Sequence, residues 1–173
     1  MTMITFILPG GSVKNKEWLE ECAMALKVDG TVRPIFWNHW TDPDAKFDKK
    51  EKANLISRHT KGDKINIIAK SIGSLVGAHV IEQIPDQINK VIVSGFPLHD
   101  IGESEKETII KALASLDPKK VICFQNVNDP HGSFAEVKKI LPSSIKIILE
   151  PRADHEYPYY SEFNKFLNLP VPG

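Results

Sequence analysis

The amino-acid sequence predicts an α/β fold, a three-layer sandwich in which helices cover both faces of a doubly wound, six-stranded parallel sheet. The first observation is a series of short runs rich in Ile, Val and Phe. Because these runs are apolar at nearly every residue, they resemble strands covered on both faces, as in a parallel sheet. The second observation is that segments with helical patterns separate the runs. Strands that alternate with helices imply right-handed crossovers and this layered architecture.

The predicted strands leave room for one helix between each pair. They are residues 4–8, 32–37, 65–69, 91–94, 121–125 and 145–149. Ligands bind beyond the carboxyl ends of the strands in such sheets, so residues that directly follow a strand are the candidates for chemistry. The corresponding loops are residues 9–13, 38–44, 70–72, 126–133 and 150–157.

Apolar residues spaced three and four apart predict the helices that follow the first and third strands. The first set is Trp18, Leu19, Cys22, Ala23 and Leu26, and the second is Ile72, Val76 and Val80. Two capping boxes, Ser104 with Glu107 and Ser133 with Glu136, predict the starts of the fourth and fifth helices. Each predicted helix therefore has a start signal or a breaker beside it.

Length and charge predict one domain over residues 1–173 and exclude several classes of partner. The chain has 22 basic and 22 acidic residues and a pI near 7.0, so it lacks the basic surface that nucleic acid or anionic lipid requires. No apolar stretch approaches the roughly 18 residues of a membrane span, and the first ten residues lack the basic start of a secretory signal. We therefore expect a cytoplasmic protein that binds neither nucleic acid nor membrane.

The two cysteines, Cys22 and Cys123, lie in apolar segments without the C-x-x-C spacing. This context predicts two buried thiols rather than a disulfide or a zinc site. We therefore expect no metal.

The clearest chemical signal is a serine directly after the third strand, in the run A-K-S-I-G of residues 69–73. A nucleophile elbow holds its serine in a strained turn between strand and helix, and the residues two before and two after must be small. Ala69 and Gly73 meet both requirements. The turn also directs the N–H of Ile72 toward the place where an oxyanion would form at Ser71.

Two other interpretations of Ser71 compete with the nucleophile elbow. The serine could cap the following helix, which on these five residues alone is an equal alternative. Lys70 and Ser71 could instead end a phosphate-binding loop of the form G-x-x-x-x-G-K-[ST]. The glycine positions of that loop would fall on Lys64 and Ala69, and no loop remains between strand and helix to hold phosphates.

The elbow resembles the G-x-S-x-G motif of the α/β-hydrolase family, with Ala69 in place of the first glycine. A serine nucleophile needs a base, and the base needs an acid that orients it. Asp129 follows the fifth predicted strand and His155 follows the sixth, so the order along the chain is Ser, Asp, His. This is the order found in α/β hydrolases. The resemblance implies that Ser71, Asp129 and His155 form a catalytic triad.

Other residues compete for the acid and base roles. His131 lies two residues from Asp129 and could serve as the base, but the family places its histidine after the last strand. Asp100, after the fourth strand, is an acid position used by some members of the family. Asp154 is too close to His155 along the chain to orient it easily.

The remaining site residues follow from the resemblance. The first strand corresponds to the third strand of the family, whose following loop supplies the second oxyanion N–H, so Gly11 would provide it together with Ile72. The alternative is a plain Gly-Gly turn. Trp37, Phe96 and Leu98 lie in loops at the same sheet edge and are candidates for the substrate pocket.

Taken over nearly the whole chain, the resemblance implies a minimal α/β-hydrolase fold that lacks the usual first two strands and has no lid. It is similar to the small single-domain serine hydrolases of the retinoblastoma-binding-protein type. The expected activity is hydrolysis of a small carboxylic ester, thioester or amide, with no cofactor. The alternative is a binding or scaffold protein that keeps the fold without the activity, because fold alone does not determine function.

Overall fold

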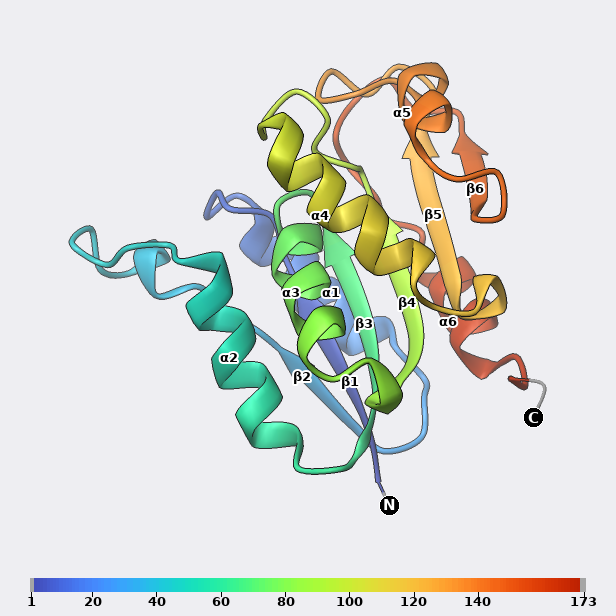
Figure 1. Cartoon of the computed structure of the whole chain (residues 1–173). Coiled ribbons are helices and arrows are strands. Elements are labelled where there is room, and N and C mark those ends of the chain that lie inside the picture. Colours follow the sequence, from blue (N-terminus) through green and yellow to red (C-terminus); the bar gives the residue numbers. More distant parts are fainter. Residues whose placement is uncertain (1, 172–173) are drawn as a thin grey trace.

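The computed structural model describes residues 2–171, which contain a six-stranded, entirely parallel sheet with the order β2-β1-β3-β4-β5-β6 (Figure 1). The fold class predicted from the sequence is confirmed. The strands are β1 (Met3–Leu8), β2 (Thr31–Pro34), β3 (Lys64–Lys70), β4 (Ile88–Ser94), β5 (Val121–Asn126) and β6 (Lys146–Glu150). The strands β1, β3, β4 and β5 are buried along most of their length, which explains why their sequences are almost continuously apolar.

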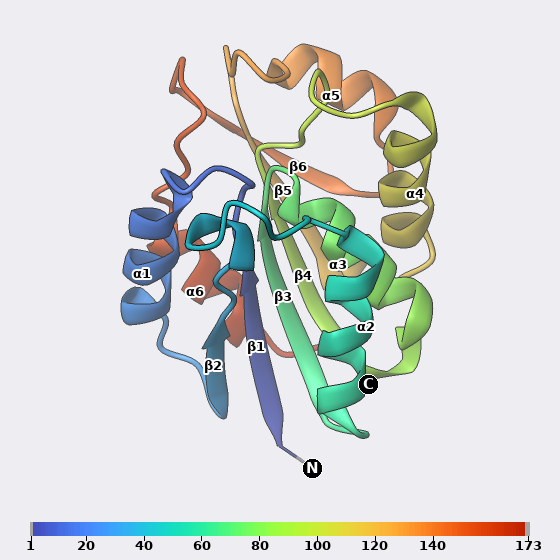
Figure 2. The same ribbon diagram turned by 90° about the vertical axis from the view of Figure 1, so that its left-hand side faces the viewer.

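Helices cover both faces of the sheet. The helices are α1 (Asn15–Ala25), α2 (Lys49–Thr60), α3 (Gly73–Gln83), α4 (Glu103–Ala114), α5 (Phe134–Ile140) and α6 (Tyr160–Asn168). Figure 2 shows α1 and α6 on one face and α2, α3, α4 and α5 on the other. Each face has its own hydrophobic core: Trp18 and Phe163 pack in the first, and Leu75 and Ile109 in the second. None of the helices within residues 2–171 is long and apolar enough to cross a membrane.

Two strand boundaries differ from the sequence prediction by three residues, and the other differences are of one residue. The second strand ends at Pro34 instead of residue 37, because the chain turns inward and buries Trp37, whose Nε1 donates to the carbonyls of Pro9 and Gly10 at 3.2 and 3.1 Å. The fourth strand begins at Ile88 instead of residue 91. The pattern missed its first residues because Lys90 is buried, and its ammonium donates to carbonyls at the end of α6, including that of Phe166 at 2.5 Å.

The two predicted capping boxes have different outcomes. The box at α5 is confirmed, since Ser133 Oγ accepts from the N–H of Glu136 at 3.3 Å and the Glu136 carboxylate accepts from the N–H of Ser133 at 2.9 Å. The box at Ser104 is wrong, because α4 begins two residues earlier than that box predicts and Gly102 is its N-cap. There the Glu105 carboxylate accepts from the N–H of Gly102 at 3.2 Å.

Both cysteines are free and buried, as the sequence predicts. Burial raises the pKa of the Cys22 and Cys123 thiols to about 12. A thiol with such a pKa stays protonated at neutral pH and is a poor nucleophile. Neither cysteine therefore has the ionisation that a reactive thiol needs.

The start of α3 lies unusually close to the end of β1. A Cβ atom built on Gly73 would come within 2.1 Å of the carbonyl oxygen of Leu8 and 2.8 Å of that of Pro9. Backbone atoms cannot move aside as a flexible side chain can. Only glycine therefore allows α3 to begin directly after Ser71 and against the end of β1.

Replacing Gly73 by alanine should lower the free energy of unfolding by about 1–3 kcal/mol, the usual cost of overpacking. Gly77→Ala, one turn later in the same helix, is the matched control. Its Cβ would lie 3.3 Å from a methyl group of Ile67, and the better helix propensity of alanine, about 1 kcal/mol, offsets that contact. Urea denaturation of both variants provides the measurement. Equal stabilities would show that the close approach of α3 to β1 is not a constraint.

Candidate active site

Ser71 occupies the turn that joins β3 to α3, and its backbone is in the left-handed region with φ of 52°. A residue other than glycine rarely adopts this conformation, and it is often found where a side chain must be presented for chemistry. The N–H of Ser71 donates to the carbonyl of Ser94 at 3.0 Å, which ties the turn to the end of β4. The N-cap of α3 is Ile72 and no side chain caps this helix. The helix-cap interpretation of Ser71 is therefore wrong.

A histidine and an aspartate that are 26 residues apart in the chain meet near the same sheet edge. His155 Nδ1 lies 2.7 Å from Asp129 Oδ2 in a partly buried hydrogen bond. The opposite ring nitrogen, Nε2, is buried and has no hydrogen-bond partner among the described residues. A carboxylate at Nδ1 places the ring proton there, which leaves Nε2 with a free lone pair able to accept a proton.

Asp129 is a buried carboxylate that accepts three hydrogen bonds. Besides His155, Tyr157 Oη donates to Oδ2 at 2.5 Å and the backbone N–H of His131 donates to Oδ1 at 2.7 Å. Burial alone would raise the pKa of Asp129, but the bonds from His155 and Tyr157, the charge of His155 and the bond from His131 together hold it below its usual value. Asp129 is therefore a carboxylate at neutral pH.

The loop that carries His155 is held by residues that the sequence analysis did not single out. The buried side chain of Asn126 donates from Nδ2 to the carbonyls of Asp154 and Glu156 at 2.9 and 2.8 Å, one on each side of His155. Tyr157 also belongs to this group, because its hydroxyl donates to Asp129 Oδ2. Only their positions, directly at or after strand ends, could have indicated these roles.

A glycine after β4 makes space for the histidine. Gly95 has φ of 67°, and a Cβ built on it would come within 2.9 Å of His155 Cε1 and 2.6 Å of Tyr157 Cε2. A side chain at this position would displace both rings. The absence of a side chain at Gly95 therefore helps to set the position of His155.

The side chain of Ile72 lies next to Gly11. A Cβ built on Gly11 would come within 3.4 Å of Ile72 Cγ2. The carbonyl of Gly11 is fixed from outside, because His39 Nε2 bonds to it at 2.5 Å and Trp40 Nε1 donates to it at 2.8 Å. These two bonds hold the peptide plane between Gly11 and Ser12 in one orientation.

The competing acid and base residues form separate pairs. His131 Nδ1 bonds to Asp100 Oδ2 at 2.7 Å, and its ring centroid lies 4.1 Å from that of His155. Asp154 pairs with Arg152 at 2.6 Å on the surface and does not orient His155. The structure thus holds two neighbouring His–Asp pairs, of which the pair with Asp129 is mostly buried and the pair with Asp100 is exposed.

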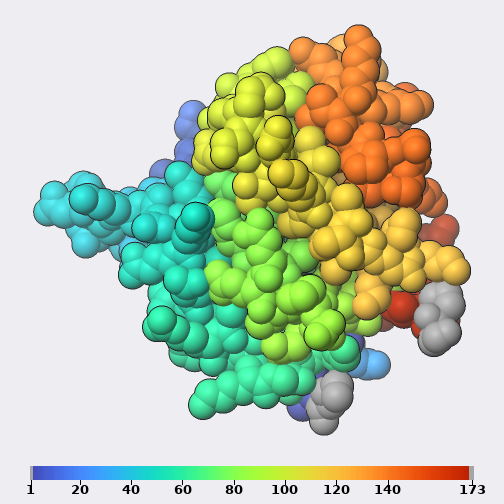
Figure 3. Space-filling view, viewed as in Figure 1, coloured from blue at the N-terminus to red at the C-terminus, as the bar shows by residue number. Residues whose placement is uncertain are grey.

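A hollow of about 510 Å³ opens over Ser71, and Gly11, Ile72 and His155 also line it. Figures 1 and 3 show the segment between β2 and α2, coloured cyan, projecting from the body of the molecule; the end of this segment contributes Phe47 to the hollow. The residues that line it are Gly11, Ser12, Lys14, Asn15, Phe47, Lys49, Lys70, Ser71, Ile72, Asp100, His131, His155 and Glu156. Most of these residues are polar or charged.

The aromatic and aliphatic residues expected to form a substrate pocket lie elsewhere. Trp37 and Phe96 are each 1% exposed and Leu98 is 8% exposed, and all three belong to the hydrophobic core instead of the lining of this hollow. Their loops do reach the sheet edge, but their side chains turn inward. The apolar contribution to the hollow comes from Phe47 and Ile72 instead.

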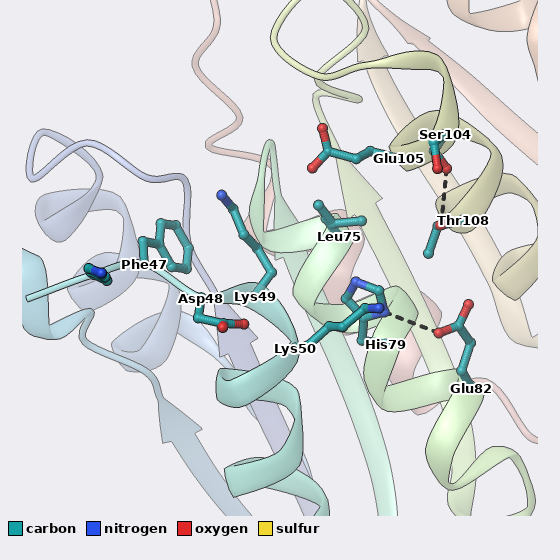
Figure 4. Close-up of a pocket in the computed structure, with 11 residues that line it drawn as sticks. Phe47, Asp48, Lys49, Lys50, Leu75, His79, Glu82, Ser104, Glu105 and Thr108 are labelled. Carbon is teal, nitrogen blue, oxygen red and sulfur yellow. Dashed lines mark hydrogen bonds and ion pairs between the residues drawn. The ribbon is translucent and has the colours of Figure 1, made fainter.

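A second hollow of about 630 Å³ lies between the start of α2 and the helices α3 and α4, and shares Phe47 and Lys49 with the first (Figure 4). It contains one histidine, His79, which pairs with the exposed Glu82 at 3.1 Å. The hydroxyl of Thr108 donates to the carbonyl of Ser104 inside α4. No nucleophile in this hollow is paired with a base, so the larger cavity is the weaker candidate for catalysis.

Comparisons with known proteins agree with this architecture. Residues 41–164 match the model of a family described as alpha/beta hydrolase domain. No curated protein matches the chain.

Solved structures with the same fold share little sequence with the chain. A protein of Pectobacterium atrosepticum described as a YdeN-like hydrolase has 16% identity and a TM-score of 0.66, covering 96% of this chain and 91% of its own. An alpha/beta hydrolase enzyme from a Medee basin deep-sea metagenome library has 11% identity and a TM-score of 0.65, with coverage of 99% and 91%. The RedJ thioesterase of prodiginine biosynthesis in Streptomyces coelicolor has 14% identity and a TM-score of 0.59, with coverage of 95% and 85%. At identities this low, the similarity shows that the fold is shared and nothing more.

The hydroxyl of Tyr157 should stabilise the charged form of Asp129. Tyr157→Phe should therefore lower stability at pH 7 by about 1.5–3 kcal/mol, the usual contribution of a hydrogen bond to a charged group. The folded pKa of Asp129 lies below its ordinary value, so this contribution is complete above that value and is lost as pH falls through the folded pKa.

Urea unfolding of the wild type and Tyr157→Phe, measured between pH 7 and pH 3, tests this expectation. The difference in stability should narrow at the acid end of the range. A difference independent of pH would mean that Tyr157 acts through packing or through its other bond, in which it accepts from the N–H of Asn126.

Proposed function

The chain belongs to the alpha/beta hydrolase family, and from this premise and the geometry above we propose that it is a serine hydrolase in which Ser71, His155 and Asp129 act together. The observation that carries the proposal is the state of His155. One ring nitrogen is bound to a buried carboxylate, and the other is unpartnered within residues 2–171 in a residue that lines the same hollow as Ser71. The bond between such a base and its serine often tightens only when substrate binds.

The first half of the reaction forms an acyl-enzyme. Ser71 Oγ attacks the carbonyl carbon of the substrate while His155 Nε2 takes its proton, and the electron pair of the C=O bond moves to the oxygen. The N–H groups of Gly11 and Ile72 donate to this oxyanion. Collapse of the tetrahedral intermediate expels the alcohol, thiol or amine, which receives the proton from His155.

The second half releases the acid. His155 takes a proton from water, the resulting hydroxide attacks the acyl carbon, and the second tetrahedral intermediate collapses with return of the proton to Ser71 Oγ. In both halves the positive imidazolium is stabilised by Asp129, whose lowered pKa keeps the carboxylate charged. No step requires a cofactor.

The proposed substrate is a carboxylic ester, thioester or amide. Structures of similar fold include the RedJ thioesterase and a type II thioesterase of the yersiniabactin pathway, YbtT, which supports the inclusion of thioesters. The hollow is open to solvent, which favours small substrates over long aliphatic ones, because an open site buries little of a long chain.

A fluorophosphonate probe tests whether Ser71 is an activated nucleophile. The wild type should be labelled at Ser71, as located by mass spectrometry of the digested protein, and Ser71→Ala should not be labelled. Ser74 provides an internal control, because it lies in the same turn of the chain and its buried hydroxyl has no base beside it. Folded wild-type protein that resists labelling would favour the non-catalytic binding or scaffold alternative.

Separate substitutions distinguish the two His–Asp pairs. His155→Ala and Asp129→Asn should each lower kcat/KM for p-nitrophenyl acetate by at least about 10³-fold, because members of a triad act as a unit. His131→Ala and Asp100→Asn, which alter the neighbouring pair, should have much smaller effects. The assignment of base and acid is wrong if the second pair of variants loses activity and the first pair retains it.

A further inference from the structure

The ammonium group of Lys70 has no role in the reaction described above, although Lys70 directly precedes the nucleophile. Its side chain is 3% exposed at the end of β3. Burial lowers the pKa of Lys70, and the nearby carboxylates of Glu156, Asp129 and Asp154 offset part of this effect. A buried lysine is rare without partners that compensate for its lost hydration. The positions of these partners indicate what the side chain does.

The shortest contact of Lys70 leads to the loop that carries Gly11. Lys70 Nζ donates to Asn15 Oδ1 at 2.8 Å, and Asn15 Nδ2 donates to the carbonyl of Ser12 at 2.9 Å. The same amide packs against Gly10, since a Cβ built there would come within 2.6 Å of Asn15 Nδ2. Asn15 therefore contacts both residues that flank Gly11.

The two sides of Gly11 are held by different means. His39 and Trp40 bind its carbonyl from the outer side of the loop. On the inner side, the chain of contacts through Asn15 ends at Lys70, which is covalently joined to Ser71. The position of the Gly11 N–H relative to the serine is thus coupled to the bond between Lys70 and Asn15.

The other contacts of Lys70 are weaker. Its Nζ lies 3.9 Å from the carboxylate of Glu156, which is 61% exposed, and 5.6 Å from the ring centroid of Trp18. An ion pair at this distance with a solvent-exposed carboxylate contributes little. The bond to Asn15 is therefore the contact through which Lys70 can influence the reaction.

We propose that Lys70 is a positioning residue that, through Asn15, fixes the loop of Gly11 at the distance from Ser71 that the oxyanion requires. This inference rests on the proposed serine-hydrolase function. Loss of the Lys70–Asn15 bond would let the Gly11 N–H drift from the oxyanion, while the nucleophile, the base and the acid stay in place. Because the oxyanion forms only in the transition state, the loss should appear in kcat and leave KM nearly unchanged.

The test compares Lys70→Met, Asn15→Leu and the double variant with the wild type in the hydrolysis of p-nitrophenyl acetate. Removing an oxyanion donor outright costs about 10²–10³-fold in kcat, so a displaced donor should cost about 10- to 100-fold. Each single variant should show this loss with KM within about twofold of the wild type. The double variant should lose no more than the single variants, because both substitutions break the same bond.

Lys90→Met is the matched control. Lys90 is also a buried lysine, on the neighbouring strand β4, but its ammonium bonds to carbonyls at the end of α6, far from Ser71 along the strands. This variant should have a lower Tm and an unchanged kcat per folded molecule. An equal loss of kcat in Lys90→Met and Lys70→Met would show that removing any buried lysine has this effect, and would contradict the proposed role of Lys70.

The outcomes separate the two proposals. A wild type without Ser71-dependent hydrolysis would contradict the proposed function itself. An active wild type together with a Lys70→Met variant that keeps kcat within twofold, or that changes KM instead, would overturn the role of Lys70. If Lys70→Met does not fold, Asn15→Leu decides in the same way, since it breaks the same bond and leaves the lysine in place.

Discussion

Asp129 is the group on which the geometry of the site depends. A carboxylate removed from water needs hydrogen bonds to remain charged, and Asp129 receives them from a histidine, a tyrosine and a backbone N–H. Tyr157 and His155 belong to the loop after β6, whereas Asp129 belongs to the loop after β5. Satisfying this one buried charge therefore joins two loops, and it fixes the imidazole in the orientation that leaves Nε2 free.

The conformation of Ser71 depends on a different constraint, which is steric. The left-handed backbone of Ser71 and the immediate start of α3 are possible because Gly73 allows the helix to approach the carbonyls at the end of β1. The same approach places Ile72 beside Gly11. A single close contact between backbone segments thus sets both the serine and the adjacent N–H groups.

The chemical character of the hollow follows from which side chains turn inward. The large apolar residues near the sheet edge, Trp37 and Phe96, are used to close the hydrophobic core. Lysines and acidic residues take the places around Ser71 instead. The rim of the hollow is therefore charged, and Lys70, next to Ser71, bonds to Asn15 of the neighbouring segment.

The sequence by itself determined the features that depend on neighbouring residues. The alternation of strands and helices, the capping box at Ser133 and the elbow around Ser71 each involve residues within a few positions of one another, so local patterns reveal them. The order of Ser71, Asp129 and His155 along the chain was also visible, because parallel strands bring their following loops to one edge.

The tertiary structure alone decided which side chains pair across that edge. The ring centroids of His131 and His155 lie 4.1 Å apart. Only the orientation of each ring therefore determines that His131 bonds to Asp100 and His155 bonds to Asp129. Trp37, which bonds to the carbonyls of Pro9 and Gly10, and Lys70, which bonds to Asn15, likewise contact residues distant in the sequence. Such contacts depend on strand register and on the packing of helices against the sheet, which no short stretch of sequence encodes.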